Sequence, residues 1–239
     1  MRLPSGWELP EAIRERLGER SGKQRAMIED GHLLLILHKL PLPGVTTREG
    51  AFFWRDAGGA WKASGGGAGL GALKTHLAEY ERTVDALDTQ LDDAQDATAL
   101  FRVLEAAVPL HRAAKNQHAA LQAAREGLPD ATELISLRDT ASDIDRASEI
   151  LEIEARNALD YRIARQSEEQ NRLTLDMTRA GHRLNSLAAV FLPLTAIASV
   201  FGMSLTSGLE GSPPWLFWSI LGFGLLLGFI LRGFFSRDR

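Results

Sequence analysis

Residues 184–209 read LNSLAAVFLPLTAIASVFGMSLTSGL and contain no charged side chain. At about 1.5 Å of rise per helical residue, roughly twenty of them span the hydrocarbon core of a bilayer, which is about 30 Å thick. A second uncharged run, residues 213–231, follows after a very short gap. We therefore predict a hairpin of two transmembrane helices, residues 184–205 and 213–232, joined by a short external loop at residues 206–212.

The arginines on either side of this hairpin predict its orientation. They precede the first uncharged run and follow the second, whereas the loop between the runs contains Glu210 and no Lys or Arg. Basic residues favour the cytoplasmic side of a membrane. The first residues of the chain also lack the apolar core of a signal peptide. We expect two membrane crossings with both termini in the cytoplasm, where residues 233–239 form a basic tail.

Composition excludes several classes of protein. The chain has 239 residues, a formal net charge of −4 and no cysteine. A weakly acidic chain is not expected to bind nucleic acid, which needs a concentrated basic patch. The absence of cysteine excludes disulfides and thiolate metal sites. We find no nucleophile–base pair and no histidine cluster with ligand spacing, and the glycine-rich residues 64–71 lack the Lys-Ser/Thr pair of a phosphate-binding loop. An enzyme is therefore not expected.

Residues 1–64 predict a small α+β cytoplasmic domain with about four strands. A short amphipathic helix is expected at residues 10–17, after a proline suited to a first helical turn. The continuous apolar run at residues 33–37 favours a buried strand. Residues 51–54 and 61–63 are predicted to form a hairpin around the sequence Asp-Ala-Gly-Gly.

Residues 65–129 predict two antiparallel helices, one acidic and one basic. Apolar residues recur every three or four positions from Leu70 onward, and Pro109 is expected to end or kink this first helix. The second helix is expected at residues 110–126, with its basic side chains facing the acidic ones. Four acidic positions share one face by spacing and form either a regulatory metal site or a solvated face paired with the second helix. They are Asp85, Asp88, Asp92 and Asp96.

Residues 130–183 are predicted to form a stalk helix that continues into the first span. Asp130 and Glu133 have the spacing of a capping box. A helix from there to Phe201 would be on the order of 100 Å long. Apolar residues seven positions apart indicate a seam between helices, and so a homo-oligomer with bundled stalks. The seam contains Leu137, Ile144, Leu151 and Ala158, with Leu134, Ile150 and Ile153 nearby.

Two motifs in the first span carry a family resemblance. They are Phe191-Leu192-Pro193-Leu194-Thr195 and, after six intervening residues, Gly202-Met203. Together with the two C-terminal spans and the long preceding helix, they resemble the CorA-like family of divalent metal-ion transporters (CorA/ZntB type). The resemblance implies a funnel-shaped homopentamer in the bacterial inner (plasma) membrane, with the first span lining the pore. It also implies divalent cations as transported or regulatory ions, and no other cofactor is expected.

The resemblance further implies which side chains face the pore. Leu184 and Leu192 would form apolar constrictions that gate by dewetting, and Thr195 would supply a ring of hydroxyls. Pro193 would bend the span, or is an ordinary membrane-helix proline. The polar residues 167–181 would form a vestibule, or are a solvated stretch of stalk. The full set of implied pore and selectivity residues is Thr178, Leu184, Leu192, Thr195, Gly202, Met203 and Ser204.

Ser204 is the main departure from the family, whose signature is Gly-Met-Asn. Mg²⁺ gives up its waters reluctantly, and a ring of short serine side chains should hold a hydrated ion more loosely than a ring of carboxamides. Glu210, repeated around the pore mouth, would concentrate cations or simply be solvated. The leading hypothesis is a channel or transporter for Mg²⁺, Zn²⁺, Co²⁺ or Ni²⁺. The alternative is a CorA-fold membrane protein that is non-selective or non-conducting and acts as a scaffold or sensor.

Overall fold

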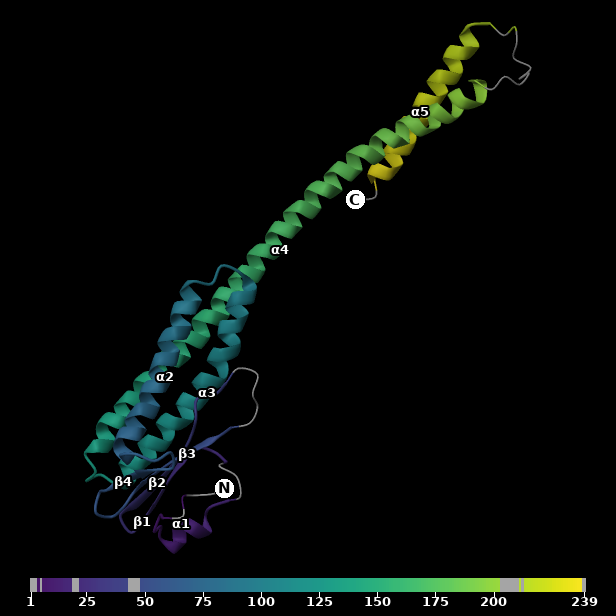
Figure 1. Ribbon diagram of the computed structural model, residues 1–239. Helices are drawn as coiled ribbons and strands as arrows, with labels where there is room; N and C mark the ends of the chain where they lie inside the picture. Colours follow the sequence, from purple (N-terminus) through teal and green to yellow (C-terminus); the bar gives the residue numbers. More distant parts are fainter. Residues whose placement is uncertain are drawn as a thin grey trace. The chain divides into compact units, whose positions relative to one another are not determined.

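The computed structural model describes residues 4, 6–18, 22–42, 48–202, 211 and 213–237. The chain forms two compact units, Met1–Ala164 and Arg165–Arg239. The first unit combines a small sheet with helices, and the described part of the second is mainly helical (Figure 1). The predicted class, mostly helical with a small N-terminal α+β part, is therefore confirmed. The expected boundaries after residues 64 and 129 fall inside the first unit.

A four-stranded antiparallel sheet forms the N-terminal part of the first unit, in the order β1-β2-β3-β4. Asp30 and Gly31 connect the first two strands and have φ values of 48° and 76°, as a two-residue hairpin turn requires. The predicted strand number and the hairpin of the last two strands are confirmed. The strands are β1 (Arg25–Glu29), β2 (His32–His38), β3 (Gly50–Arg55) and β4 (Trp61–Ala63).

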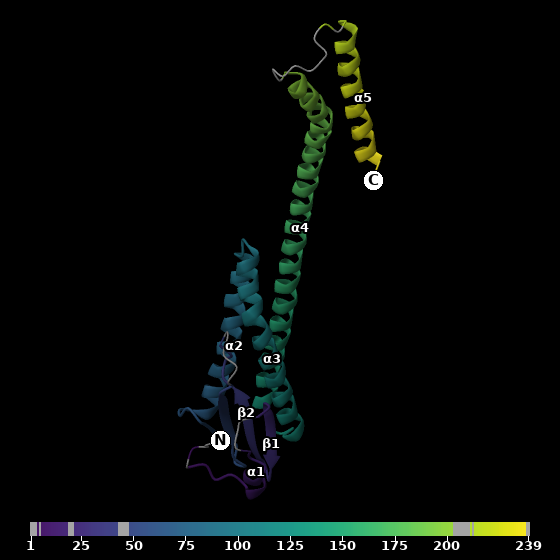
Figure 2. The same cartoon turned by 90° about the vertical axis from the view of Figure 1, so that its right-hand side faces the viewer.

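Residues 33–37 of strand β2 are all apolar, which fits a sheet that is covered on both faces. Its leucines at positions 33, 35 and 37 belong to the large core shared with the long helices. The residues at positions 34 and 36 belong to a smaller cluster with Ile13 of α1 (Glu11–Glu15). Figure 2 shows α1 beside β1 at one end of this unit. A strand buried on both faces explains the continuous apolar run.

Two long helices, α2 (Gly69–Asp92) and α3 (Ala97–Gly127), cover one face of the sheet. Gly69 lies so close to β4 that a Cβ there would come 2.3 Å from the backbone nitrogen of Lys62. No side chain fits into this contact. The glycine-rich stretch therefore allows α2 to begin directly against the sheet.

The break between α2 and α3 lies at residues 93–96, so the prediction that Pro109 ends the first helix was wrong. Pro109 lies inside α3. Asp96 begins that helix because its Oδ1 accepts a hydrogen bond from the backbone N–H of Ala99 at 2.7 Å. This cap satisfies a donor that would otherwise be free, whereas Pro109 removes one backbone hydrogen bond from the helix.

The predicted long helix is confirmed as α4 (Glu133–Gly202), which contains 70 residues. Glu133 does not take the expected capping role. Its Oε1 accepts hydrogen bonds from Arg55 Nε at 2.8 Å and from Trp61 Nε1 at 3.3 Å. These bonds attach the beginning of α4 to β3 and β4.

The apolar seam in the first half of α4 packs within the chain, so its assignment to contacts between the stalks of different chains was wrong. Leu137, Ile144 and Leu151 belong to the same buried core as α2 and α3. Ile150 and Ile153 are 46% and 51% exposed. At 3.6 residues per turn they point away from that buried stripe. Formation of a homo-oligomer remains a prediction, and this seam gives no support for it.

The second unit contains the remainder of α4 and α5 (Trp215–Arg237). The predicted spans thus coincide with helix over residues 184–202 and 215–232. Within the described ranges, no helix was found that is both long and apolar enough to cross a membrane. The loop expected at residues 206–212 lies largely outside the described residues.

Candidate functional site

Five described residues of the predicted pore lie along one face of α4. At 3.6 residues per turn they fall within about a third of the helix circumference. Leu184 and Leu192 are 68% and 67% exposed in the single chain. Met203, Ser204 and Glu210 lie outside the described residues. The five residues on this face, called the pore face below, are Thr178, Leu184, Leu192, Thr195 and Gly202.

Helix α5 packs against α4 on the side roughly opposite the pore face. A Cβ at Gly224 would lie 2.9 Å from Ile197 Cδ1, and a Cβ at Gly228 would lie 3.0 Å from Val190 Cα. Such close approach is typical of small residues four positions apart in membrane helices. The chain's own second helix therefore leaves Thr178, Leu184, Leu192 and Thr195 of the pore face uncovered.

Pro193 marks a gap in the hydrogen bonding of α4 beside Gly228. Proline has no N–H, so the carbonyl of Ala189, four residues earlier, receives no helical hydrogen bond from it. That carbonyl oxygen lies 3.4 Å from the position that a Cβ of Gly228 would occupy. A side chain at residue 228 would thus meet the backbone of α4, where no flexible atom can move aside.

The threonines of the pore face keep acceptor capacity for a hydrated ion. Thr195 Oγ1 donates to the carbonyl of Phe191 at 2.7 Å, and Thr178 Oγ1 donates to the carbonyl of Thr174 at 2.8 Å. Each hydroxyl proton is used within α4, and each oxygen retains lone pairs. These oxygens can accept hydrogen bonds from the waters of a hydrated cation.

The four predicted metal-sensing carboxylates do not share one helix. Asp85, Asp88 and Asp92 are exposed on α2, whereas Asp96 caps α3. No ion pair joins the described carboxylates of α2 to basic residues of α3, contrary to the expected pairing. Across the described ranges, no group of three or more His, Asp or Glu side chains is arranged to hold a metal ion. A regulatory metal site remains a prediction.

A histidine–carboxylate cluster joins α3 to α4, and the sequence analysis missed it. His111 Nδ1 lies 2.9 Å from Glu152 Oε2, and His118 Nδ1 lies 3.0 Å from Asp145 Oδ2. His111 Nε2 also lies 3.8 Å from Asp145 Oδ1. The signal was present, because the two histidines are seven residues apart, as are the two carboxylates. We did not predict this cluster because the basic side chains of α3 were expected to pair with the acidic face of α2 instead.

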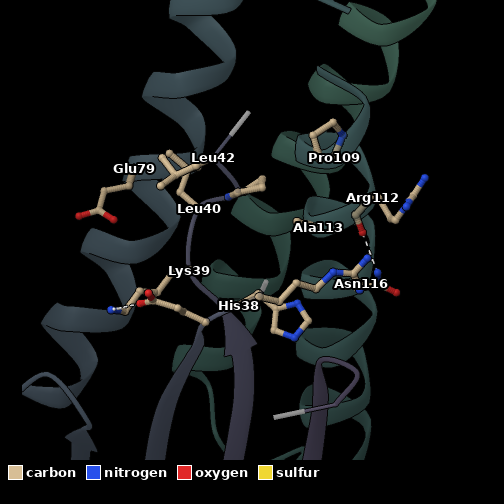
Figure 3. Close-up of a pocket in the computed structure, with 12 residues that line it drawn as sticks. His38, Lys39, Leu40, Leu42, Glu79, Pro109, Arg112, Ala113 and Asn116 are labelled. Carbon is tan, nitrogen blue, oxygen red and sulfur yellow. Dashed lines mark hydrogen bonds and ion pairs between the residues drawn. The ribbon is translucent and has the colours of Figure 1, made fainter. Parts of the chain in front are cut away.

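A hollow of about 580 Å³ opens where β2 ends between α2 and α3 (Figure 3). Lys39 Nζ and Glu49 Oε2 form an ion pair of 2.8 Å at its edge. Burial lowers the pKa of His38, against the opposing effect of its hydrogen bond to the Gly22 carbonyl. Tyr80 donates to the carbonyl of His38 at 3.0 Å. Lys39 and Glu49 thus satisfy each other at this hollow, and we assign no ligand to it.

Comparison with known proteins identifies the family. A family model described as "CorA-like Mg2+ transporter protein" matches residues 68–237, which include α2 to α5. A search among curated proteins found no match. A solved structure described as "structure of the full-length CmaX protein" is similar with a TM-score of 0.55 and 16% identity, over 95% of this chain and 83% of that one. This likeness supports a shared fold.

The complete structure of the CorA magnesium transporter from Methanocaldococcus jannaschii aligns with a TM-score of 0.43 and 14% identity, over 96% of this chain and 83% of that one. The family match carries more weight, because it extends over more than half of the chain and includes both helices of the second unit. The chain therefore belongs to the CorA-like Mg²⁺ transporter protein family.

Proposed function

We propose that the protein moves divalent cations, Mg²⁺ or Zn²⁺, Co²⁺ and Ni²⁺, across the bacterial inner membrane through a homopentameric pore lined by the second half of α4. The observation that carries the proposal is the uncovered pore face within the segment that the family model matches. α5 would form the outer ring. Both termini would lie in the cytoplasm.

The exposed apolar side chains of the second unit support a bilayer and further copies of the chain as partners. Burial of one large apolar side chain stabilises by about 1.5–3 kcal/mol, so a chain that exposes many of them needs a surface to cover them. The sequence runs 184–209 and 213–231 contain no charge. Within the described part of these two runs, the exposed large apolar side chains are Leu184, Leu187, Phe191, Leu192, Trp215, Phe217, Trp218, Phe223, Leu225, Leu226, Phe229 and Ile230.

The order of side chains along the pore face suggests a passage for a hydrated ion. Ser204 and then Thr195 would offer hydroxyl oxygens to the ion's water shell, which Mg²⁺ retains. Leu192 and Leu184 would follow as apolar rings that close the passage by dewetting. Thr178 would return the ion to a polar vestibule. Glu210 would raise the cation concentration at the external mouth.

A second candidate function follows from Ser204. A serine ring is wider than an asparagine ring and holds a hydrated ion more loosely, so selectivity could be lost. The protein would then be a non-selective or non-conducting member of the family that serves as a membrane scaffold or sensor. A cytoplasmic domain that we infer to be shorter than is usual in the family also motivates this second candidate.

A flux assay on the full chain in liposomes separates the two candidates. Mg²⁺, Zn²⁺, Co²⁺, Ni²⁺ and Na⁺ are offered in turn, with empty liposomes as the blank. The control variant is Leu187→Ala, which removes an exposed leucine outside the pore face. The proposed function predicts divalent flux in both proteins. Absence of flux for every ion would contradict it and favour the scaffold.

A further inference from the structure

We propose that Arg183 of α4 and Arg232 of α5 form a binding site for the headgroup of an anionic phospholipid. Both residues belong to the second unit, and each directly adjoins one of the uncharged runs of the sequence. The proposal rests on the membrane location put forward for this unit, because a phospholipid reaches the two helices only in a bilayer. It does not depend on transport.

Arg183 lies on the side of α4 that meets α5. It precedes Val190 by seven residues, which is close to two complete turns, so the two positions share one side of the helix. Val190 is a contact point for α5, since a Cβ at Gly228 would lie 3.0 Å from its Cα. Leu192 of the pore face is about two and a half turns from Arg183 and lies on the opposite side. Arg183 is exposed, so its charge is open to a ligand outside the pore.

Arg232 has the matching position on α5. It follows Gly228 by four residues, about one turn, and this places it on the side of α5 that meets α4. A Cβ at Gly228 would meet α4 at Val190, whereas one at Gly224 would meet it at Ile197. Residue numbers therefore rise on α5 as they fall on α4, and position 232 corresponds to about position 186 of α4. The two arginine positions thus lie within about one helical turn of the same level.

Two positive charges at one level favour a bound counter-charge. Among the described residues, no carboxylate lies within ion-pair distance of Arg183, whereas Arg179, one turn earlier, pairs with Asp176 at 3.4 Å. Residues 184–209 and 213–231 contain no acidic side chain. The last three residues, Arg-Asp-Arg, are themselves net basic. An anion bound between Arg183 and Arg232 would offset this positive charge.

The apolar side chains beside Arg232 favour a phospholipid over a free anion. Phe229 and Leu225 precede Arg232 by three and seven residues, so they share its side of α5. Their exposed fractions are 59% and 37%. The rise from position 232 to position 225 is about 10 Å, which fits within the roughly 15 Å depth of one leaflet. A phosphate held at the arginines would therefore place acyl chains against this exposed apolar stripe.

The paired arginines also favour a headgroup with a net negative charge. A guanidinium group binds phosphate oxygens through parallel N–H groups. A choline headgroup would bring its own positive charge next to two arginines, whereas a glycerol headgroup leaves the phosphate charge unopposed. Basic residues at a membrane surface attract anionic lipids for this reason. We therefore expect phosphatidylglycerol to bind in preference to phosphatidylcholine.

Native mass spectrometry of the full chain in detergent tests the site. The chain is incubated with equal amounts of phosphatidylglycerol and phosphatidylcholine that have identical acyl chains, and the retained lipids are quantified. We expect phosphatidylglycerol to be retained about five-fold over phosphatidylcholine, and Arg183→Gln and Arg232→Gln each to lose most of this preference. The matched control is Arg165→Gln, at an exposed arginine five turns earlier on the same side of α4. It should keep the preference.

Three results would overturn the inference. One is equal retention of the two lipids by the native chain, which needs no variant to fold. Another is a preference that survives in both Arg183→Gln and Arg232→Gln. The third is displacement of phosphatidylglycerol by an equal concentration of inorganic phosphate, which would show that free phosphate is the ligand.

Ion flux in liposomes is recorded separately, so that this inference and the proposed function can fail independently. A preference for phosphatidylglycerol without flux would leave the lipid site in place and contradict transport. Flux without a lipid preference would contradict the lipid site alone.

Discussion

The two units of the chain differ in how far their large apolar side chains are buried. In the first unit, Leu33, Leu73 and Leu137 are at most 2% exposed, whereas in the second unit Leu184 and Leu192 are more than 60% exposed. The first unit is stabilised by a core of its own. The second buries little within one chain, which supports the proposal that lipid and neighbouring copies complete it. Substitutions of the same kind should thus have different effects in the two units.

Matched leucine truncations should show the largest difference. Leu137→Ala removes a buried side chain from the core and should lower the free energy of unfolding of the first unit by about 3 kcal/mol. Leu184→Ala should change that free energy by less than about 0.5 kcal/mol, but should widen a constriction and raise flux. Hydrogen exchange of the β2 amides in the full chain reports the first unit. Equal destabilisation by both variants would contradict the comparison.

The buried His76 should make the stability of the first unit depend on pH. It is 7% exposed, and burial lowers its pKa to about 4, against a smaller opposing effect of the Gln117 amide. The unfolded chain binds this proton near pH 6.5 and the folded chain only near pH 4. Stability should therefore fall as the pH falls from about 6.5 to 4, by about 3 kcal/mol for this shift.

The measurement is the difference in unfolding free energy between the native chain and His76→Phe, followed from pH 7 to 4. The difference curve isolates His76, because other groups titrate in both proteins. A flat curve would show that the core around His76 is open to water. His182→Gln, at an exposed position, serves as the control and should leave the slope unchanged.

Substitution of Gly228 should have a smaller effect on stability, and this effect should be confined to the second unit. Gly228→Leu places side-chain atoms against the backbone of α4 at Val190 and Ala189, and overpacking of this kind costs about 1–3 kcal/mol. The thermal transition of the second unit and the flux should both decrease. Gly222→Leu is the matched control, since a Cβ there meets nothing within 4 Å. If the two variants behave alike, the described contact of α4 with α5 is wrong.

Ser204→Asn should have the smallest energetic effect. The longer carboxamide should narrow the ring and favour hydrated Mg²⁺ over the other divalent ions by several-fold, equivalent to about 1 kcal/mol. Competition between Mg²⁺ and Co²⁺ in the liposome assay measures the ratio. An unchanged ratio would count against a filter role for this position.

Periodicity predicted most of the fold, because the strands and the long helix carry strong local signals. The run at residues 33–37 and the absence of Pro and Gly over residues 131–180 are such signals. The partner of an apolar stripe is not encoded locally, so the seam through Leu137 was assigned to other chains although it packs on α2 and α3. Pro109 was overrated as a helix breaker, and the cap at Asp96 was overlooked.

The candidate site depended on the resemblance more than on periodicity. Positions such as Leu192 and Thr195 were assigned to the pore because they belong to a motif that carries the family resemblance. The side on which α5 packs could not be predicted, because the contact of Gly228 with Val190 joins residues that are far apart in sequence. The pairing of His111 with Glu152 was missed for the same reason.

Cysteine accessibility along α4 tests the central claim, that the face opposite α5 lines the pore. Single cysteines at Thr178, Leu184, Leu192 and Thr195, in a chain that has no other cysteine, should react with a water-soluble thiol reagent and block flux. Cysteines at Val190 and Ile197, which face α5, should react at least ten-fold more slowly and leave flux unchanged. Reaction and block confined to Val190 and Ile197 would contradict the account.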